Sequence, residues 1–213
     1  MRRMALLYRA DVNPSKLELL AAWLPSRPWY REESAAGLAR VASYRFDDPE
    51  GAVGIETLLV AVGEGPVYQV PLTYRGAPLE RADDWLVGTT EHSVLGRRWV
   101  YDACGDAVYA AALARAVLAD AGQAEQMIEV DGELQRREPS MTITGSGVPD
   151  GDVPPIGSLV RVEPDDPTGI VTDSVELVVV RRLGGISARA GATLTGTWDG
   201  RPTPQPLAYA APR

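Results

Sequence analysis

Three segments in the first half of the chain show the hydrophobic pattern of β-strands. Leu38–Phe46 is amphipathic, Val53–Val62 is strongly apolar, and Pro66–Arg75 alternates between apolar and polar side chains. A period of two places successive side chains on opposite faces of a strand. Turn residues between the segments predict an antiparallel meander. Pro71 interrupts the third segment and predicts an edge position or a bulge, because proline has no N–H to donate.

Two other segments show helical spacing of their apolar residues. The first begins at Pro14, with Asn13 as its candidate N-cap, and is expected to end at Pro25. The second, Asp106–Ala119, is rich in Ala, which has the highest helix propensity, and begins with Asp106 as its cap. Each segment has one apolar face and is therefore expected to pack on a core.

The pattern changes after Gly122, where helical spacing stops and short β-rich segments alternate with Gly and Pro turns. We therefore expect an α+β domain over residues 1–122 and a small β-rich domain over residues 123–213, although the two could also be two sheets of one unit. The tail Arg201–Arg213 is rich in Pro and Ala and is expected to be loose. The β-rich segments are Glu125–Val130, Ser140–Gly145, Leu159–Glu163, Gly169–Thr172, Val175–Arg182 and Ala192–Trp198.

The charge balance argues against polyanionic partners, and the short apolar runs argue against a transmembrane helix. The 213 residues contain 21 basic and 29 acidic side chains, which gives a net charge of −8. An acidic protein repels the phosphate backbone, so nucleic-acid binding is not expected. No apolar run approaches the roughly 20 residues that a transmembrane helix needs. One free Cys and no export signal predict a cytoplasmic protein.

Rare residue types limit the chemistry further. Cys104, His92 and Lys16 are each the only residue of their kind. One Cys excludes an internal disulfide and a Cys-based zinc site, and one His excludes a site with two His ligands. No Gly-rich phosphate loop is present. The sequence therefore predicts no metal, no cofactor and no assigned catalytic residue, and Cys104 is expected to be a small buried hydrophobe.

Aromatic and charged side chains are the remaining candidates for binding. Exposed Trp and Tyr rings can stack on sugars or on partner proteins. The alternative is that these rings fill the core of a chain that has a single Phe. The candidate binding residues are Trp29, Tyr30, Trp85 and Trp99 for stacking, Arg97 and Arg98 as polar anchors, and Glu91 and His92 beside them.

The segment Gly88–Ala103, with the sequence GTTEHSVLGRRWVYDA, resembles the N-terminal cap of actinobacterial maltokinases, which phosphorylate maltose in the route from trehalose to glycogen. Leu17–Leu20, Gly54–Leu59 and Tyr68–Arg75 fit the same cap in the same order, so that the resemblance spans roughly residues 4–120. It implies an antiparallel sheet curved around a helix, a cystatin-like arrangement.

The resemblance implies a function outside catalysis. In those kinases a His–Asp pair follows the cap, whereas no His follows His92 here. The implied role is a non-catalytic binding or regulatory protein of α-glucan, maltose or trehalose (glycogen) metabolism. Its expected partners are an α-glucan or an enzyme of that pathway, and a homo-oligomer is left open. Two alternatives are an enzyme acting on a sugar or sugar phosphate around His92, and a structural or oligomeric protein without a small ligand.

Overall fold

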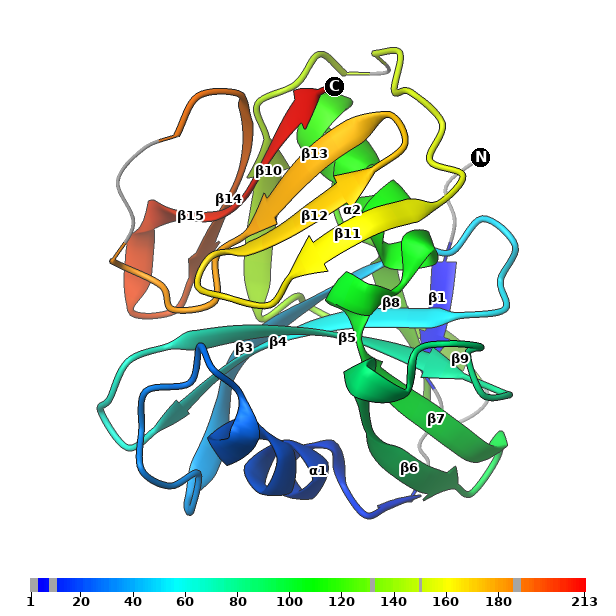
Figure 1. The fold of residues 1–213 in the computed structure, drawn as a ribbon. Coiled ribbons are helices and arrows are strands. Elements are labelled where there is room, and N and C mark those ends of the chain that lie inside the picture. Colours follow the sequence, from blue (N-terminus) through cyan, green and yellow to red (C-terminus); the bar gives the residue numbers. More distant parts are fainter. Residues whose placement is uncertain (1–3, 8–10, 131–132, 150, 186–188) are drawn as a thin grey trace.

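The computed structural model describes residues 4–7, 11–130, 133–149, 151–185 and 189–213. It is an α+β protein with two six-stranded antiparallel sheets, one three-stranded sheet and two α-helices in these ranges. The first large sheet, the cap sheet, lies below the second, the C-terminal sheet, in Figure 1. The expected fold class is confirmed.

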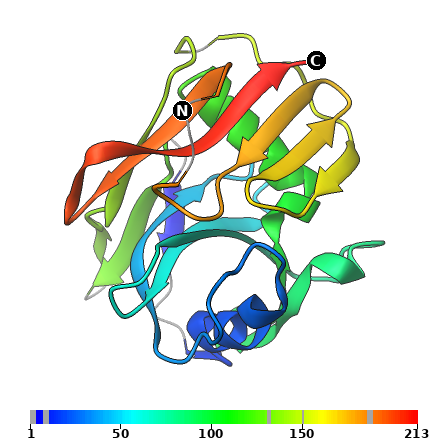
Figure 2. The ribbon, with the colours of Figure 1, turned by 60° about the vertical axis from the view of Figure 1, so that its left-hand side comes forward.

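The cap sheet is the predicted meander extended by a hairpin, and it curves around helix α1, Lys16–Trp23 (Figure 2). All its pairs are antiparallel. The three predicted strands are confirmed, the first at its predicted bounds and the others one or two residues shorter. In sheet order the strands are β2 (Val12–Asn13), β6 (Leu86–His92), β7 (Gly96–Asp102), β5 (Tyr68–Arg75), β4 (Gly54–Val62) and β3 (Leu38–Phe46).

Pro71 lies on an internal strand, so the predicted edge position is wrong. Strand β5 pairs with β4 over Tyr68–Tyr74, but its pairing with β7 begins only at Leu72. On the same side, the backbone N–H of Gln69 donates to the carbonyl of Arg181. Pro71 therefore falls in the gap between two sets of backbone partners, where its missing N–H leaves no ladder bond unmade.

Helix α1 begins two residues later than expected, at Lys16 instead of Pro14, behind a different cap. The hydroxyl of Ser15 accepts from the backbone N–H of Glu18, and the carboxylate of Glu18 accepts from the N–H of Ser15, which forms a capping box. Asn13, the predicted cap, pairs with Glu91 in the sheet instead. After Trp23 the chain continues as a 3-10 turn, Leu24–Ser26, which includes Pro25.

A buried carboxylate ties α1 to the cap sheet. Glu56 of β4 accepts hydrogen bonds from Lys16 and from the hydroxyl of Tyr74, and Arg45 lies 3.7 Å away. Burial alone would raise the pKa of Glu56, but the charges of Lys16 and Arg45 outweigh it and lower the pKa to about 2. The single Lys of the chain is thus a structural ion-pair partner.

The C-terminal sheet contains the tail that was expected to be loose, so that expectation is wrong. Residues Arg201–Pro212 form β15, which pairs with a neighbour on each side over Ala208–Ala210. The strands in sheet order are β10 (Met141–Gly145), β14 (Ala192–Trp198), β15, β13 (Val175–Val179), β12 (Thr168–Thr172) and β11 (Leu159–Glu163). The small third sheet has β8 (Glu125–Val130) between β1 (Met4–Leu7) and β9 (Glu133–Arg136).

Helix α2, Ala107–Leu118, joins the two large sheets through one core. It begins with Asp106 as its cap, as predicted, and seven of its 12 residues are buried. A helix that is apolar on most sides lies between layers rather than at a surface. Its Tyr109 ring lies 6.3 Å from Phe46 of β3, and the opposite side packs on β10, β14, β15 and β13. The division at residue 122 into two domains stays a prediction.

Two polar side chains cross directly from one sheet to the other. The amide of Gln69 on β5 donates to the carbonyls of Val180 and Leu207, both at 2.9 Å, and accepts from the hydroxyl of Tyr44. Arg181, with no exposed surface, donates to the carboxylate of Asp102 at 2.7 Å. Because a buried charge is tolerated only when it is paired, this contact fixes where the sheets meet. We call Gln69, Asp102 and Arg181 the inter-sheet joint.

We expect acid to weaken the fold through Glu56. Its pKa is lower in the folded protein than in the unfolded chain, so its stabilisation is complete above about pH 4.5 and is lost as the pH falls toward 2. The free energy of unfolding should fall by at most about 3 kcal/mol more in wild type than in Glu56→Gln over this interval. Urea titrations at pH 6, 4.5 and 3 measure the difference, and parallel curves for the two proteins would contradict it.

Breaking the ion pair of the joint should be costly. Arg181→Met leaves the carboxylate of Asp102 buried without its partner, which lowers the free energy of unfolding by about 3–5 kcal/mol. Adding Asp102→Asn removes that charge and should restore part of the loss. The matched control is Arg182→Met, on the exposed neighbour, with a change within about 0.5 kcal/mol. Urea unfolding of the variants measures all three values, and an equal effect at both arginines would refute the assignment.

Candidate ligand-binding cleft

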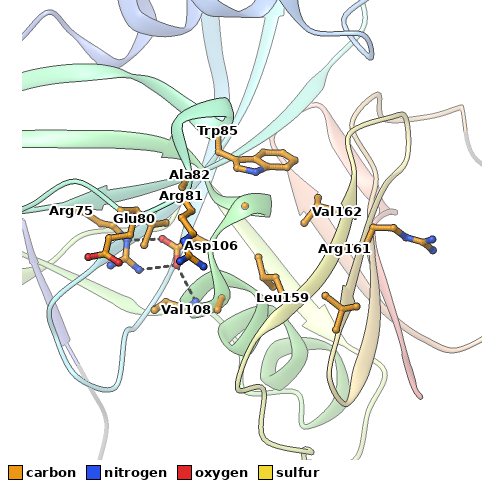
Figure 3. A pocket seen from close by; sticks show the side chains of 14 residues that line it. Arg75, Glu80, Arg81, Ala82, Trp85, Asp106, Val108, Leu159, Arg161 and Val162 are labelled. Carbon is orange, nitrogen blue, oxygen red and sulfur yellow. Dashed lines mark hydrogen bonds and ion pairs between the residues drawn. The ribbon is translucent and has the colours of Figure 1, made fainter.

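A cleft of about 520 Å³ opens where the two sheets meet. It is lined by the loop from β5 to β6, by the start of α2 and by the edge strand β11 (Figure 3). Small-molecule sites in proteins have volumes of about 300–1,000 Å³, so this cleft has room for a small ligand. We call it the junction cleft.

The walls of the junction cleft differ in chemistry. In Figure 3, Leu159 and Val162 of β11 present apolar side chains on one side, and Trp85 lies above them. The opposite side is charged and carries Arg75, Glu80, Arg81 and Asp106. The guanidinium of Arg161 points away from the cleft, and its partner is Glu163 at 3.1 Å.

One ion pair on the charged wall is locked by the helix beside it. Arg75 donates two hydrogen bonds of 2.8 Å to the two carboxylate oxygens of Asp106, which has 1% of its surface exposed. The same carboxylate accepts from the N–H of Val108 and so caps α2. The hydrogen bonds to Asp106 raise the pKa of Arg75. This pair is a rigid part of the wall, because two charge-assisted hydrogen bonds hold Arg75 to a carboxylate that also caps the helix.

Trp85 keeps its place through a close approach to Gly105. A Cβ added at Gly105 would lie 2.2 Å from Cγ of the indole, far inside van der Waals contact. The missing side chain therefore lets the ring lie against the backbone just before α2. Trp85 itself is half-buried and packs against the core that α2 shares with both sheets.

Arg81 and Glu80 differ from the locked pair because neither has an ion-pair or hydrogen-bond partner among the described residues. Both are exposed. Arg81 has a φ of +57°, a left-handed conformation that a non-glycine residue rarely adopts. The preceding loop residue, Leu79, is anchored by a 2.9 Å bond from its N–H to the hydroxyl of Tyr101. Such strain in a held loop is frequent at binding sites.

All four predicted polar binding residues lie on another part of the molecule, the β6–β7 hairpin. Glu91 and Arg97 pair with each other at 2.7 Å, and Arg98 donates to the carbonyl of Leu95. Nδ1 of His92 accepts from the N–H groups of Val94 and Leu95, so the imidazole closes the hairpin turn. Burial, with help from the charges of Arg98 and Lys16, lowers the pKa of His92. Trp99 is half-buried on β7.

Two of the predicted stacking residues lie in the core beneath the cap sheet. Trp29 has 1% and Tyr30 has 7% of its surface exposed. The guanidinium of Arg181 lies 4.5 Å from the centre of the Trp29 ring, and Trp23 and Tyr68 surround the rest. The faces of Trp29 are therefore occupied by the protein itself. Whether any of the predicted residues binds a ligand stays a prediction.

The structure thus places the eight predicted residues in three separate locations. Trp29 and Tyr30 lie in the core, Trp85 lies in the cleft, and the other five lie on the β6–β7 hairpin. Sequence reasoning missed Arg75, Glu80 and Arg81, and identified Asp106 only as a helix cap. The loop Gly76–Asp84 has no periodic pattern, and a single Arg in such a loop gave no signal. Cys104 is fully buried as expected, and burial raises its thiol pKa.

Among the described residues, no three His, Cys, Asp or Glu side chains form a potential metal cluster. Within the same part of the chain, no helix has the length and apolar character needed to cross a membrane.

Comparison with known proteins finds a family match over part of the chain. Residues 23–106 match the family described as the maltokinase N-terminal cap domain. The resemblance predicted from the sequence is thus confirmed over these residues, a narrower span than the 4–120 that we expected. The matched segment includes the β5–β6 loop, Trp85 and Asp106 and excludes β11, so one wall of the junction cleft comes from outside the match. No curated protein matches the chain.

Asp106 should be important for stability through both of its contacts. Asp106→Ala removes the cap of α2 and leaves Arg75 unpaired, and we expect the free energy of unfolding to fall by about 2–4 kcal/mol. Asp106→Asn keeps a capping oxygen and loses the charge, so its loss should be smaller. Exposed Asp84 supplies the control Asp84→Ala, expected within about 0.5 kcal/mol. Urea unfolding monitored by circular dichroism tests the order, and equal losses at Ala and Asn would contradict a capping role.

Proposed function

We propose that the chain is a non-catalytic binding or regulatory protein of maltose and α-glucan metabolism, including the trehalose and glycogen route, and that it acts in the cytoplasm. One observation carries the proposal. The segment that matches the maltokinase cap supplies the charged wall and the Trp85 roof of a cleft large enough for a small ligand. An aromatic ring opposite hydrogen-bonding groups suits a carbohydrate, whose ring has apolar faces and polar edges.

The packing supports a role in which the cap and the C-terminal sheet act together. Strand β11, helix α2 and the β5–β6 loop all border the junction cleft, and the joint between Asp102 and Arg181 holds the sheets in place. A ligand in the cleft would therefore contact both parts of the chain. Its binding would stabilise the folded protein by mass action, and a partner enzyme could sense that state.

An enzyme with a site around His92 is supported less well. Nδ1 of His92 already accepts two backbone N–H groups, and the nearest charged pair, Glu91 and Arg97, is self-contained at 2.7 Å. A general base needs a nitrogen that is free to take a proton from the substrate. We propose the hairpin residues Glu91, Arg97 and Arg98 as contacts for a partner protein, and Trp85 as the ligand contact.

Affinity electrophoresis in gels that contain glycogen or soluble starch tests the proposal. We expect the protein to migrate more slowly in either gel than in a gel without polysaccharide, with bovine serum albumin as the non-binding control. Pull-downs with tagged protein should in parallel recover an enzyme that acts on maltose, trehalose or glycogen. Unchanged mobility together with no such enzyme in the pull-down would overturn the proposal. A stable oligomer under those conditions would then favour the structural alternative.

A further inference from the structure

We propose that the junction cleft binds one uncharged pyranose ring, stacked on Trp85 and hydrogen-bonded by Arg81 and Glu80. This inference deepens the proposed function and rests on it only for the identification of the sugar as part of an α-glucan. The site is built from three separate parts of the chain, the β5–β6 loop, the start of α2 and the edge strand β11.

The shape of the apolar surface suits a sugar ring. Trp85 lies above the cleft, and Leu159 and Val162 line one side (Figure 3). The C–H faces of a pyranose are apolar and pack on an indole, while the hydroxyl groups at its edge need polar partners. A purely apolar ligand would leave the opposite, charged wall without solvent, which is unfavourable.

The charges of the opposite wall favour a neutral ligand. Arg75 and Arg81 contribute two positive charges, and Glu80 and Asp106 contribute two negative charges, so the wall is balanced. The fifth charged residue, Arg161, points away and pairs with Glu163. A phosphate or an ammonium group would meet a like charge in this wall as well as an opposite one. A hydroxyl group can donate to a carboxylate and accept from a guanidinium, so it can use both kinds of side chain.

Two members of this wall are wholly available for such bonds, whereas the other two are engaged with each other. Arg75 and Asp106 are bound to each other by two hydrogen bonds. Arg81 and Glu80 have no partner among the described residues, and they stand next to each other in the chain. The backbone of this pair is held in place, because Arg81 has a left-handed conformation and the N–H of Leu79 is bonded to the hydroxyl of Tyr101. Preorganised groups lose less entropy when they bind a ligand.

Isothermal titration calorimetry with maltose, cellobiose, glucose 6-phosphate and glucosamine tests the inference. We expect wild type to bind maltose or cellobiose and to bind the two charged sugars at least tenfold more weakly. Arg81→Gly should weaken binding of the neutral sugar at least tenfold while the melting temperature holds or rises, because glycine relieves the positive φ. Arg161→Ala is the matched control and should bind as wild type does.

Gly105→Ala tests the placement of Trp85 without changing a polar group. The new Cβ would displace the indole, so sugar binding should weaken at least tenfold, as in Trp85→Ala. Circular dichroism and thermal unfolding show whether each variant is folded. If both of these variants fail to fold, Arg81→Gly alone decides, because it retains the backbone and the core.

The outcomes separate this inference from the proposed function. No binding of any of the four sugars, binding of a charged sugar alone, or equal binding by wild type and Arg81→Gly overturns the inference. Retardation by glycogen that Arg81→Gly leaves unchanged overturns the inference and preserves the proposed function. Binding of cellobiose that depends on Arg81, without retardation by glycogen and without a pathway enzyme in the pull-down, preserves the inference and overturns the proposed function.

Discussion

The buried ion pair between Asp102 and Arg181 determines how the rest of the molecule is arranged. Arg181 has no exposed surface, and the side chain of Asp102 is 2% exposed, so neither charge can be left without the other. Arg181 follows β13 of the C-terminal sheet, and Asp102 ends β7 of the cap sheet. The guanidinium also lies over the ring of Trp29 and donates to Thr168. A displacement of one sheet along the other would therefore break charge-assisted hydrogen bonds in a medium of low dielectric.

The same carboxylate sets the geometry of the junction cleft. One oxygen of Asp102 accepts from Arg181, and the other accepts from the N–H of Cys104 and so begins the turn that leads to Gly105 and α2. The ring of Trp85 packs against Gly105, and Arg75 donates a hydrogen bond to the carboxylate of Asp106. Each of these contacts is short, so the groups that it joins cannot shift far relative to each other. The roof and the charged wall are thus positioned by the joint, although the joint itself does not line the cleft.

The parts of the fold that follow from local pattern could be predicted, and the parts that depend on distant partners could not. The amphipathic segment Leu38–Phe46 forms β3, and the Ala-rich segment that follows the cap Asp106 forms α2. The Pro and Ala content of Arg201–Arg213 predicts a loose tail, yet the prolines at 202, 204 and 206 lie where β15 has only β14 beside it. That half of the strand tolerates them. Its other half, Ala208–Pro212, also pairs with β13, whose partner residues lie 29 to 37 positions earlier in the chain, and no local pattern reveals such partners.

The candidate site was even less visible in the sequence, because its parts are ordinary when taken alone. Aromatic residues were the strongest signal for binding, but burial separates them. Trp29 is enclosed by Arg181 and other rings, whereas Trp85 is held half-buried by a glycine. The partial exposure of Trp85 depends on Gly105, which lies 20 positions further along the chain. Amino-acid composition does not reveal such a contact. Net charge is equally uninformative about the cleft. The whole chain has a net charge of −8, whereas the charged wall has two arginines and two carboxylates and is neutral. Local pairing therefore decides what the cleft can bind, and overall charge does not.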